Sequence, residues 1–273
     1  MSTRPYDAAL PARSSFLASL RIQVRVIQAL IMRELHTRYG RENVGYLWMI
    51  GEPMLLASVI GLLHSNSGHS SYGGDIKPLP FAVLGYTTFI LFRGIVNRSE
   101  GGVEANAPLL YHRQVTVLDI ALARGFLEFA GTFLTFVILM GLIISFGFAE
   151  LPARPLALIG GWALMFWYAM GHSFVISAIT YENRTIGRLV HPYSYFMVGL
   201  SGAFLPLAWL PHPFREWLSY IPMTSIFELV RYGQFRSANL DYFYGGYLVG
   251  ACLVLTWTGL VLMRRMRSHI HLA

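Results

Sequence analysis

Lysine and cysteine are almost absent from this chain of 273 residues. Its only lysine, Lys77, is followed by Pro78, whereas an ATP-binding P-loop needs a lysine between a glycine-rich turn and a Ser or Thr. Its only cysteine, Cys252, can form neither an intrachain disulfide nor a thiolate metal cluster, so we expect it to be a small packing residue. The sequence therefore offers no P-loop with which to hydrolyse ATP.

Patterns for metal binding and catalysis are missing as well. The histidines are scattered, no His-Glu-x-x-His is present, and only His269 and His271 stand close together. The apolar segments contain no carboxylate pair, no nucleophile beside a base, and no series of ionisable residues such as a proton-coupled carrier needs. We expect no metal, no cofactor and no catalytic residue on this chain, and an energy source outside it.

Apolar residues dominate the composition, with 55% hydrophobic, 14% aromatic and only 13% charged residues. Such a chain is too apolar for an ordinary soluble domain. Apolar runs of roughly 20 residues cross about 30 Å of hydrocarbon as helices, so we predict an all-α integral membrane protein with six transmembrane helices. The predicted spans are 44–64, 79–96, 119–148, 155–180, 191–210 and 242–263, within a membrane domain of residues 44–263 between a cytoplasmic N-terminal segment, 1–43, and a cytoplasmic tail, 264–273.

The placement of arginine predicts the orientation of the spans. Arginines are concentrated ahead of the first span, between the fourth and fifth spans, and after the sixth. Because Lys and Arg near span ends stay on the cytoplasmic side, we expect both termini to be cytoplasmic. No signal peptide is predicted, so the N-terminus is expected to be retained. The formal net charge of +7 indicates topology and affinity for anionic lipid rather than binding to nucleic acid.

The segment before the first span has the pattern of an amphipathic helix. It is expected to lie along the cytoplasmic membrane surface and to end near Gly40. Such a helix serves either as a simple anchor or as a docking surface for a cytoplasmic partner. Its two faces separate at helical spacing into the apolar residues Leu20, Val24, Ile27 and Ile31 and the polar residues Arg21, Arg25 and Gln28.

Two connections between spans stand out. The inner loop 97–119 contains a glycine pair and a short helix-length piece interrupted by Pro108, and Asp119 is placed to cap the third span. Taken alone, this loop is a polar connection. The outer segment 211–240 contains two apolar pieces of roughly ten residues, too short to cross a membrane. We expect a re-entrant periplasmic hairpin whose bends lie at Pro211, Pro213 and Pro222.

A few residues within the predicted spans suggest specific packing. The intramembrane charges are few: Glu52, Arg93, Arg124 and Glu128. The last two are placed to pair on one helix face near the cytoplasmic side. A small-xxx-small pair in the sixth span is expected to allow close helix packing, either within the protomer or at a dimer seam. This pair is Gly246 and Gly250.

Three segments carry a resemblance to a known family. They are "MRELHTRYGRENVGYLWMIGEP" at 32–53, "NRSEGGVEANAPLLYHRQVTVLDIALARGFLE" at 97–128 and "YIPMTSIFELVRYGQF" at 220–235. In their order and spacing, over about residues 22–265, the chain resembles the permease subunit of bacterial ATP-binding-cassette polysaccharide exporters, specifically the capsular polysaccharide export family.

The resemblance implies a type-2 exporter permease that moves lipid-linked capsular polysaccharide across the inner membrane. It further implies a homodimer, two cytoplasmic ATPase subunits that bind the ATP and Mg, and a periplasmic adaptor and outer-membrane channel as further partners. The alternatives are a permease for another glycan, such as O-antigen or teichoic acid, and a drug or lipid exporter. No nucleic acid is expected among the partners.

The resemblance also assigns roles to residues. An interface helix is implied to include Arg25, Arg33, Glu34 and Arg38, beside the ATPase. A coupling helix that sits in a cleft of the ATPase is implied at Glu104, Ala105, Asn106, Ala107, Leu109, Leu110 and Tyr111. Force from the ATPase is expected to pass through these elements into the spans.

Aromatic side chains are candidates for a path along which the glycan slides. Aromatic rings stack on the C–H faces of sugars without regard to exact sequence, and a sliding polymer needs many weak contacts of this kind. For any single ring, lipid-facing or interfacial packing is the competing role. The candidates are Tyr46 and Trp48 in the first span, Phe89 and Phe92 in the second, and Tyr193, Tyr195 and Phe196 in the fifth.

Overall fold

The structure is a computed structural model that describes residues 16–39, 51, 54–55, 58–59, 75–111 and 115–267. Within these residues the regular structure is helical throughout, as the composition predicts. The helices are α1 (Phe16–Tyr39), α3 (Pro78–Asn97), η1 (Glu104–Asn106), α4 (Ala107–Leu110), α5 (Val117–Ser145), α6 (Pro155–Glu182), α7 (Arg184–Leu200), η2 (Leu207–Trp209), α8 (His212–Ser219), α9 (Pro222–Gln234) and α10 (Gly245–Arg267).

Among the described helices, α3, α5, α6 and α10 are long and apolar enough to cross a membrane. They match the predicted second, third, fourth and sixth spans. The predicted first span, 44–64, lies almost entirely outside the described residues. The predicted fifth span, 191–210, overlaps α7, which ends at Leu200 and contains Pro192. The count of six spans therefore stays a prediction.

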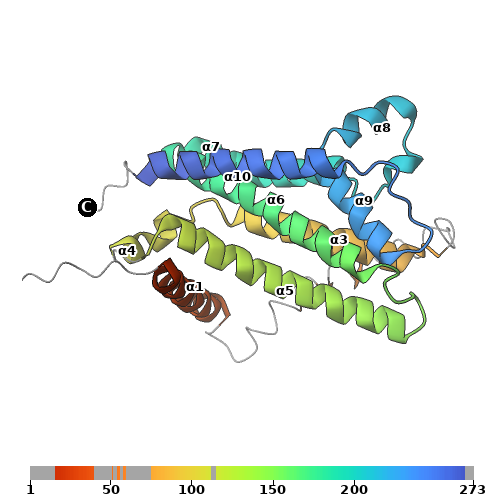
Figure 1. Ribbon diagram of the computed structural model, residues 1–273, viewed down its shortest axis with the longest axis horizontal. Coiled ribbons are helices and arrows are strands. Elements are labelled where there is room, and N and C mark those ends of the chain that lie inside the picture. Colours follow the sequence, from red (N-terminus) through yellow and green to blue (C-terminus); the bar gives the residue numbers. More distant parts are fainter. Residues whose placement is uncertain are drawn as a thin grey trace, which may run out of the picture.

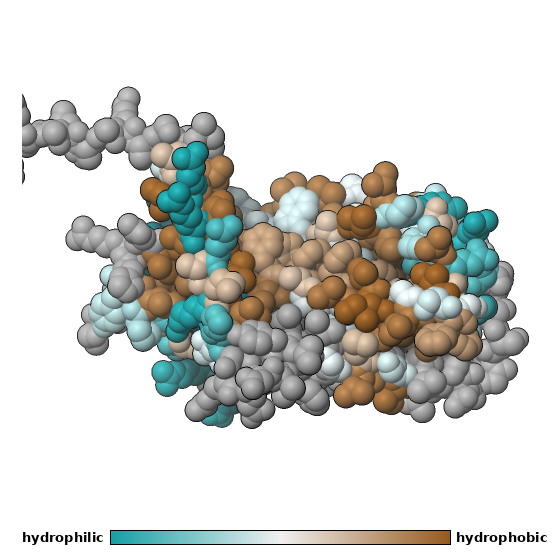
Figure 2. Space-filling view, turned by 90° about the horizontal axis from the view of Figure 1, so that it is seen from below, coloured by the Kyte–Doolittle hydropathy of each residue, from teal (hydrophilic) through white to brown (hydrophobic). Residues whose placement is uncertain are grey.

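The long helices lie side by side along one axis (Figure 1). At one end of this bundle are α1, α4 and the last turn of α10, and at the other end is α8. We refer to them as the α4 end and the α8 end. Figure 2, turned by 90°, shows hydrophilic side chains gathered toward the two ends and hydrophobic ones across the middle. This distribution suits a protein whose middle lies in hydrocarbon.

Local sequence signals explain where several helices begin. Thr116 and Asp119 form a capping box at the start of α5, in which each side chain accepts a hydrogen bond from the other residue's backbone amide, so the predicted cap at Asp119 is confirmed. Prolines stand in the first turns of α3, α6, α8 and α9, where a missing N–H costs nothing. The helix breaks at Pro211 and Pro222 agree with the expected bends, while the re-entrant path of α8 and α9 stays a prediction.

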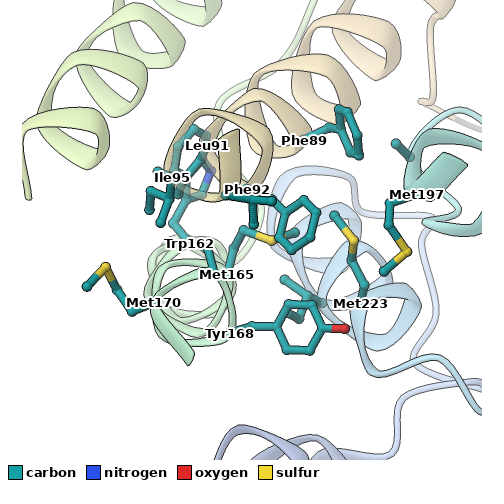
Figure 3. Packing of buried hydrophobic residues seen from close by; sticks show 14 of the residues in the cluster. Phe89, Leu91, Phe92, Ile95, Trp162, Met165, Tyr168, Met170, Met197 and Met223 are labelled. Atoms are coloured by element: carbon teal, nitrogen blue, oxygen red, sulfur yellow. The ribbon is translucent and has the colours of Figure 1, made fainter. Parts of the chain in front are cut away.

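The hydrophobic core is centred on α3. In the most apolar 18-residue stretch of α3, 78% of the residues are buried, compared with 22% in the corresponding stretch of α10. Figure 3 shows Phe92 lying between α3 and α6, close to Met165 and Tyr168. The helix α3 is thus enclosed by its neighbours, and α10 presents most of its surface to the outside of the protomer.

One packing prediction was wrong for the protomer. Side chains added at Gly246 and Gly250 would meet nothing within 4 Å, so these glycines create no close contact inside the chain. The helices α6 and α10 approach each other closely at glycines nearer the C-terminal end of α10. A Cβ on Gly259 would stand 2.5 Å from Phe174 Cβ, and one on Gly171 would stand 2.9 Å from Leu255 Cβ. The motif did not reveal which face of α10 packs on α6, and a role for Gly246 and Gly250 at a dimer seam stays a prediction.

Candidate functional site

The segment 98–111, which we call the α3–α5 loop, begins by attaching to α6. Ser99 Oγ lies 2.8 Å from Ser173 Oγ, and Ser177 Oγ donates to the carbonyl of Ser99 at 3.3 Å. Gly101 follows with φ at 61°, a left-handed conformation that glycine adopts without strain. The start of the loop is therefore anchored to the side of α6 before the chain reverses.

Charged side chains connect the same loop to α5 and α1. Arg98 Nε lies 2.6 Å from Glu128 Oε1, and Arg124 Nη1 donates to the carbonyl of Arg98 at 3.2 Å. Arg124 Nε lies 3.2 Å from Glu34 Oε1 of α1. The two side chains form an ion pair, but the Nε–H of Arg124 does not form a hydrogen bond with that oxygen. Both Arg124 and Glu128 thus have partners on other elements, which their spacing on α5 did not predict.

The helix α1 packs against α5 and α4. Leu30 is buried against Ile120 and Ala123 of α5. Gln23 Nε2 donates to Asp119 Oδ1 at 3.0 Å, next to the cap of α5. Of the predicted apolar face, Ile27 and Ile31 reach this cluster, whereas Leu20 and Val24 are about half exposed. The helix therefore holds the loop and the start of α5, and its position on a membrane surface stays a prediction.

A direct hydrogen bond joins α1 to the predicted coupling helix. Arg33 Nη1 donates to Asn106 Oδ1 at 2.7 Å, and Asn106 Nδ2 donates to the carbonyl of Gly102 at 2.9 Å. Asn106 is only 3% exposed. Both polar atoms of its side chain form hydrogen bonds inside the protomer. Asn106 therefore positions the loop and does not belong to an exposed contact surface.

The remaining predicted coupling residues separate into two groups. Leu109 and Leu110 are partly buried and pack against the cluster around Leu30, and their predicted contact with the ATPase stays a prediction. Glu104 and Ala107 are partly buried. The exposed residues, which we call the outward face, are Ala105, Pro108 and Tyr111. Inward leucines hold the segment to α1, and the outward face is exposed.

The predicted interface residues are placed in different ways. Arg25 is exposed, Arg33 binds Asn106, and Glu34 pairs with Arg124. Arg38 belongs to α1, but its side chain lies outside the described residues. The helix thus contributes both an exposed cation and two inward contacts.

The α3–α5 loop also reaches α7. Glu100 Oε2 lies 3.7 Å from His191 Nε2, and the Glu100 side chain covers Gly187, where an added Cβ would stand 2.8 Å from Oε1. A small cavity of about 20 Å³ lies beneath the loop, lined by Arg98, Ser99, Arg124, Glu128 and Ser173 among others. It has room for about one water molecule and is not large enough for a substrate. The loop is therefore a structural junction of α1, α3, α5, α6 and α7.

The proposed aromatic path is only partly compatible with the structure. Tyr46 and Trp48 lie outside the described residues. Phe89 and Phe92 are 2% and 0% exposed, and Figure 3 shows both within the core, which corrects their assignment to the path because their rings are already covered. Tyr193 is half-buried with its ring centroid 6.2 Å from that of His172. Only two of the described candidates are well exposed, namely Tyr195 at 59% and Phe196 at 69%.

A buried ion pair near the α8 end was missed by the sequence analysis. Arg231 Nη1 lies 3.0 Å from Glu228 Oε1, and their side chains are 5% and 10% exposed. Arg231 also donates to the carbonyls of Gly202 and Ala203, and Glu228 accepts from the amide of Leu207 at 3.3 Å. The i, i+3 spacing of opposite charges in an apolar piece was the available signal. The pair fixes the turn that follows α7.

Comparisons with known proteins now identify the family. Residues 25–235 match the family described as "ABC-2 type transporter". The chain belongs to this family. Capsule polysaccharide export inner-membrane protein CtrC of Neisseria meningitidis serogroup B is 38% identical over 258 residues, covering 94% of this chain and 97% of the relative.

Two further relatives cover nearly the same length. Capsule polysaccharide export inner-membrane protein BexB of Haemophilus influenzae is 32% identical, with 94% of this chain and 97% of the relative covered. Polysialic acid transport protein KpsM of Escherichia coli is 28% identical over 262 residues, with 93% and 96% covered. The resemblance stated from the sequence is thereby confirmed, and the chain is a membrane subunit of the ABC-2 type.

Proposed function

We propose that this chain is the membrane-spanning subunit of an ATP-driven exporter that moves lipid-linked capsular polysaccharide across the bacterial inner membrane. Support comes from relatives that are named capsule polysaccharide export inner-membrane proteins and align over nearly the whole chain. Two copies of the chain form the permease, and two cytoplasmic ATPase subunits supply the hydrolysis. A periplasmic adaptor and an outer-membrane channel continue the path to the cell surface.

The α3–α5 loop carries this proposal, because it is built to pass on movement. Its outward face is available to a partner, while its inward side is bonded to α1 through Asn106, to α5 through Arg98 and to α6 through Ser99. A push on a loop without such bonds would deform the loop. With these bonds, displacement of the outward face moves α1, α5 and α6 together.

The proposed orientation places the α4 end in the cytoplasm. Arg264, Arg265 and Arg267 lie in the last turn of α10, which reaches this end, and α7 begins there with Arg184. Concentration of arginine at one end agrees with the rule that cations are retained on the cytoplasmic side. The α8 end then faces the periplasm. Both termini and the ATPase contact lie on the cytoplasmic side in this arrangement.

The experiment that tests the function is a site-specific crosslink from the outward face to the ATPase, made in a Cys252→Ser background. Ala105→Cys is expected to crosslink to the ATPase in membranes. Ala208→Cys is the matched control, because Ala208 is also exposed but precedes α8 at the opposite end. No crosslink from positions 105, 108 or 111 in a complex that still exports would contradict the coupling assignment, and an ATPase crosslink from position 208 would contradict the orientation.

The cargo needs its own measurement. In a strain that lacks the chain, we expect loss of surface capsule and accumulation of the polymer inside the cell, both restored by the native chain. Loss of O-antigen or teichoic acid with a normal capsule would contradict the proposed cargo while leaving the permease role in place.

A further inference from the structure

Arg93 differs from the other described arginines whose side chains are partly or fully buried, since each of those contacts a carboxylate or a backbone carbonyl. It is partly buried in α3, and among the described residues no carboxylate or carbonyl accepts a hydrogen bond from it. Its guanidinium carbon instead lies 4.0 Å from the ring centroid of Tyr195 on α7. Three other arginines each contact a glutamate, namely Arg98, Arg124 and Arg231.

The contact with Tyr195 leaves the hydrogen-bonding capacity of Arg93 unused. A guanidinium has five N–H donors in a planar fork, and the face of an aromatic ring attracts its charge without accepting those donors. A cation within a span is costly unless an anion or a wet cavity compensates it. The arrangement therefore presents a charged group whose position is fixed and whose donors suit an anionic ligand.

Beside this cation, α7 has an exposed side with polar and aromatic residues. Arg188, His191, Tyr195 and Phe196 are all exposed, and their spacing places them along one side of the helix. The first two lie nearer the α4 end, where His191 is close to Glu100, and the two rings follow toward the middle of the bundle. The order along α7 is thus polar and cationic, then aromatic, which suits an amphiphile with an anionic head and an apolar tail.

The depth of Arg93 suits a lipid phosphate. It precedes Asn97, the last residue of α3, by about one helical turn, or roughly 6 Å. That places the guanidinium near the α4 end of a predicted span, within reach of the headgroup region of one leaflet. A ligand that enters from this leaflet would bring its phosphate to Arg93 and its hydrocarbon against the exposed rings.

We infer that Arg93, held over Tyr195, binds the phosphate through which the exported glycan is joined to its lipid. The inference rests on the proposed function and adds to it the chemistry of the cargo's anchor, a phosphate ester. Arginine suits this task because its fork donates two parallel hydrogen bonds to phosphate oxygens. Phe196 and the ring of Tyr195 then contact the apolar part of the anchor.

Binding can be measured on the chain with its ATPase in nanodiscs of phosphatidylcholine. The probe is radiolabelled hexadecyl phosphate, and hexadecanol is the neutral competitor. The native complex is expected to retain the phosphate amphiphile in an excess of hexadecanol. Arg93→Gln is expected to weaken binding about tenfold, the size of a lost charge-assisted contact worth about 1.4 kcal/mol. Arg93→Lys, which keeps the charge but lacks the fork, is expected to fall in between.

Arg264→Gln is the matched control. Arg264 is exposed in the last turn of α10, so this variant loses the same charge at the same end of the molecule. We expect it to bind the probe as the native complex does. Equal loss of binding in both variants would show general attraction of anionic lipid, and native binding by Arg93→Gln would show that the phosphate is held elsewhere. Either result overturns the inference.

Export in cells separates this inference from the proposed function. Arg93→Gln is expected to reach the membrane in native amounts and bind its ATPase, yet to lower surface capsule at least tenfold, while Arg264→Gln exports normally. Loss of probe binding with normal export would mean that Arg93 holds bulk phospholipid and not the cargo, which overturns the inference but not the exporter. Tyr195→Phe keeps the ring and is expected to behave as native, and Tyr195→Ala is expected to resemble Arg93→Gln in binding.

Discussion

The two ends of the molecule are held together by different kinds of bond. At the α4 end, side chains bond to side chains of other elements, as in Arg33 with Asn106 and Arg98 with Glu128. At the α8 end, arginines bond mostly to backbone carbonyls. Arg215 donates to the carbonyls of Leu207, Ala208 and Leu210, and Arg154 donates to those of Tyr232 and Phe235.

This difference indicates what each end does. The bonds of Arg215 to carbonyls close in sequence fix the local shape of a segment that would otherwise have unsatisfied backbone groups in an apolar setting, while those of Arg154 join the start of α6 to the end of α9. Bonds between side chains on separate helices fix how those helices are placed relative to one another. We therefore expect the bonds at the α8 end mainly to keep its fold, and we propose that those at the α4 end let several helices move as a unit.

The largest expected effect comes from breaking the buried pair at the α8 end. Arg231→Met leaves Glu228 buried without its partner and frees the carbonyls of Gly202 and Ala203. We expect a loss of roughly 3–5 kcal/mol of folding stability, seen as a much lower yield and thermal midpoint in detergent. The double variant Arg231→Met with Glu228→Gln is expected to recover part of this loss. A stable single variant would mean that the pair does not hold this end.

The second prediction separates the inward and outward sides of the α3–α5 loop. Leu110→Asp places a charge against the cluster around Leu30 and is expected to cost about 1–3 kcal/mol of stability. Its neighbour Tyr111 is 56% exposed, so Tyr111→Asp is expected to change stability by less than about 0.5 kcal/mol while lowering export. Thermal midpoints and surface capsule are measured for both. Equal thermal midpoints would contradict the division of the loop into two sides.

The third prediction concerns the bond between α1 and the loop. Arg33→Ala and Asn106→Ala are each expected to lower stability by about 1 kcal/mol. In a double-mutant cycle the two changes are expected to be non-additive by at least about 0.5 kcal/mol, because either one removes the same hydrogen bond. Arg25→Ala combined with Asn106→Ala is the control pair, since Arg25 is exposed on α1, and additive effects are expected there. Additive effects in the Arg33 cycle would rule out the bond.

The smallest effect is expected from acid at the α8 end. Burial acts to raise the pKa of Asp75, but hydrogen bonds from the Ser237 hydroxyl and from the amides of Arg236 and Ser237 outweigh it and lower the pKa below 3.8. A lowered carboxyl pKa stabilises the fold above the unfolded value, and this contribution is lost as the pH falls through the lowered value. When the pH is lowered below about 3.8, the thermal midpoint of the native chain is therefore expected to decrease more than that of Asp75→Asn. Parallel curves would contradict this.

Hydropathy and capping signals predicted the helices that depend on local sequence. The spans seen as α3, α5, α6 and α10 were predicted because length and apolar composition suffice to define them. The cap at Asp119 was predicted because its partner, Thr116, is close in sequence. These features need no knowledge of how the helices pack.

Features that depend on packing were not predicted. Asn106 was assigned to a contact surface, but its partner Arg33 lies 73 residues away in the chain, and no local pattern connects them. The spacing of Arg124 and Glu128 suggested only that these two residues pair with each other. A pattern along one helix cannot predict their contacts with Glu34 and Arg98 on other elements. The division of the loop into inward and outward sides likewise required the position of α1.

We propose above that the bonded α3–α5 loop passes ATPase movement into the membrane helices. The most direct test is the amount of polymer exported per ATP hydrolysed by the reconstituted complex, compared between the native chain and Asn106→Ala. We expect Asn106→Ala to assemble and to hydrolyse ATP at a rate close to native but to export at least tenfold less polymer per ATP. A native ratio in Asn106→Ala, with the Arg33 bond shown to be absent, would contradict the claim.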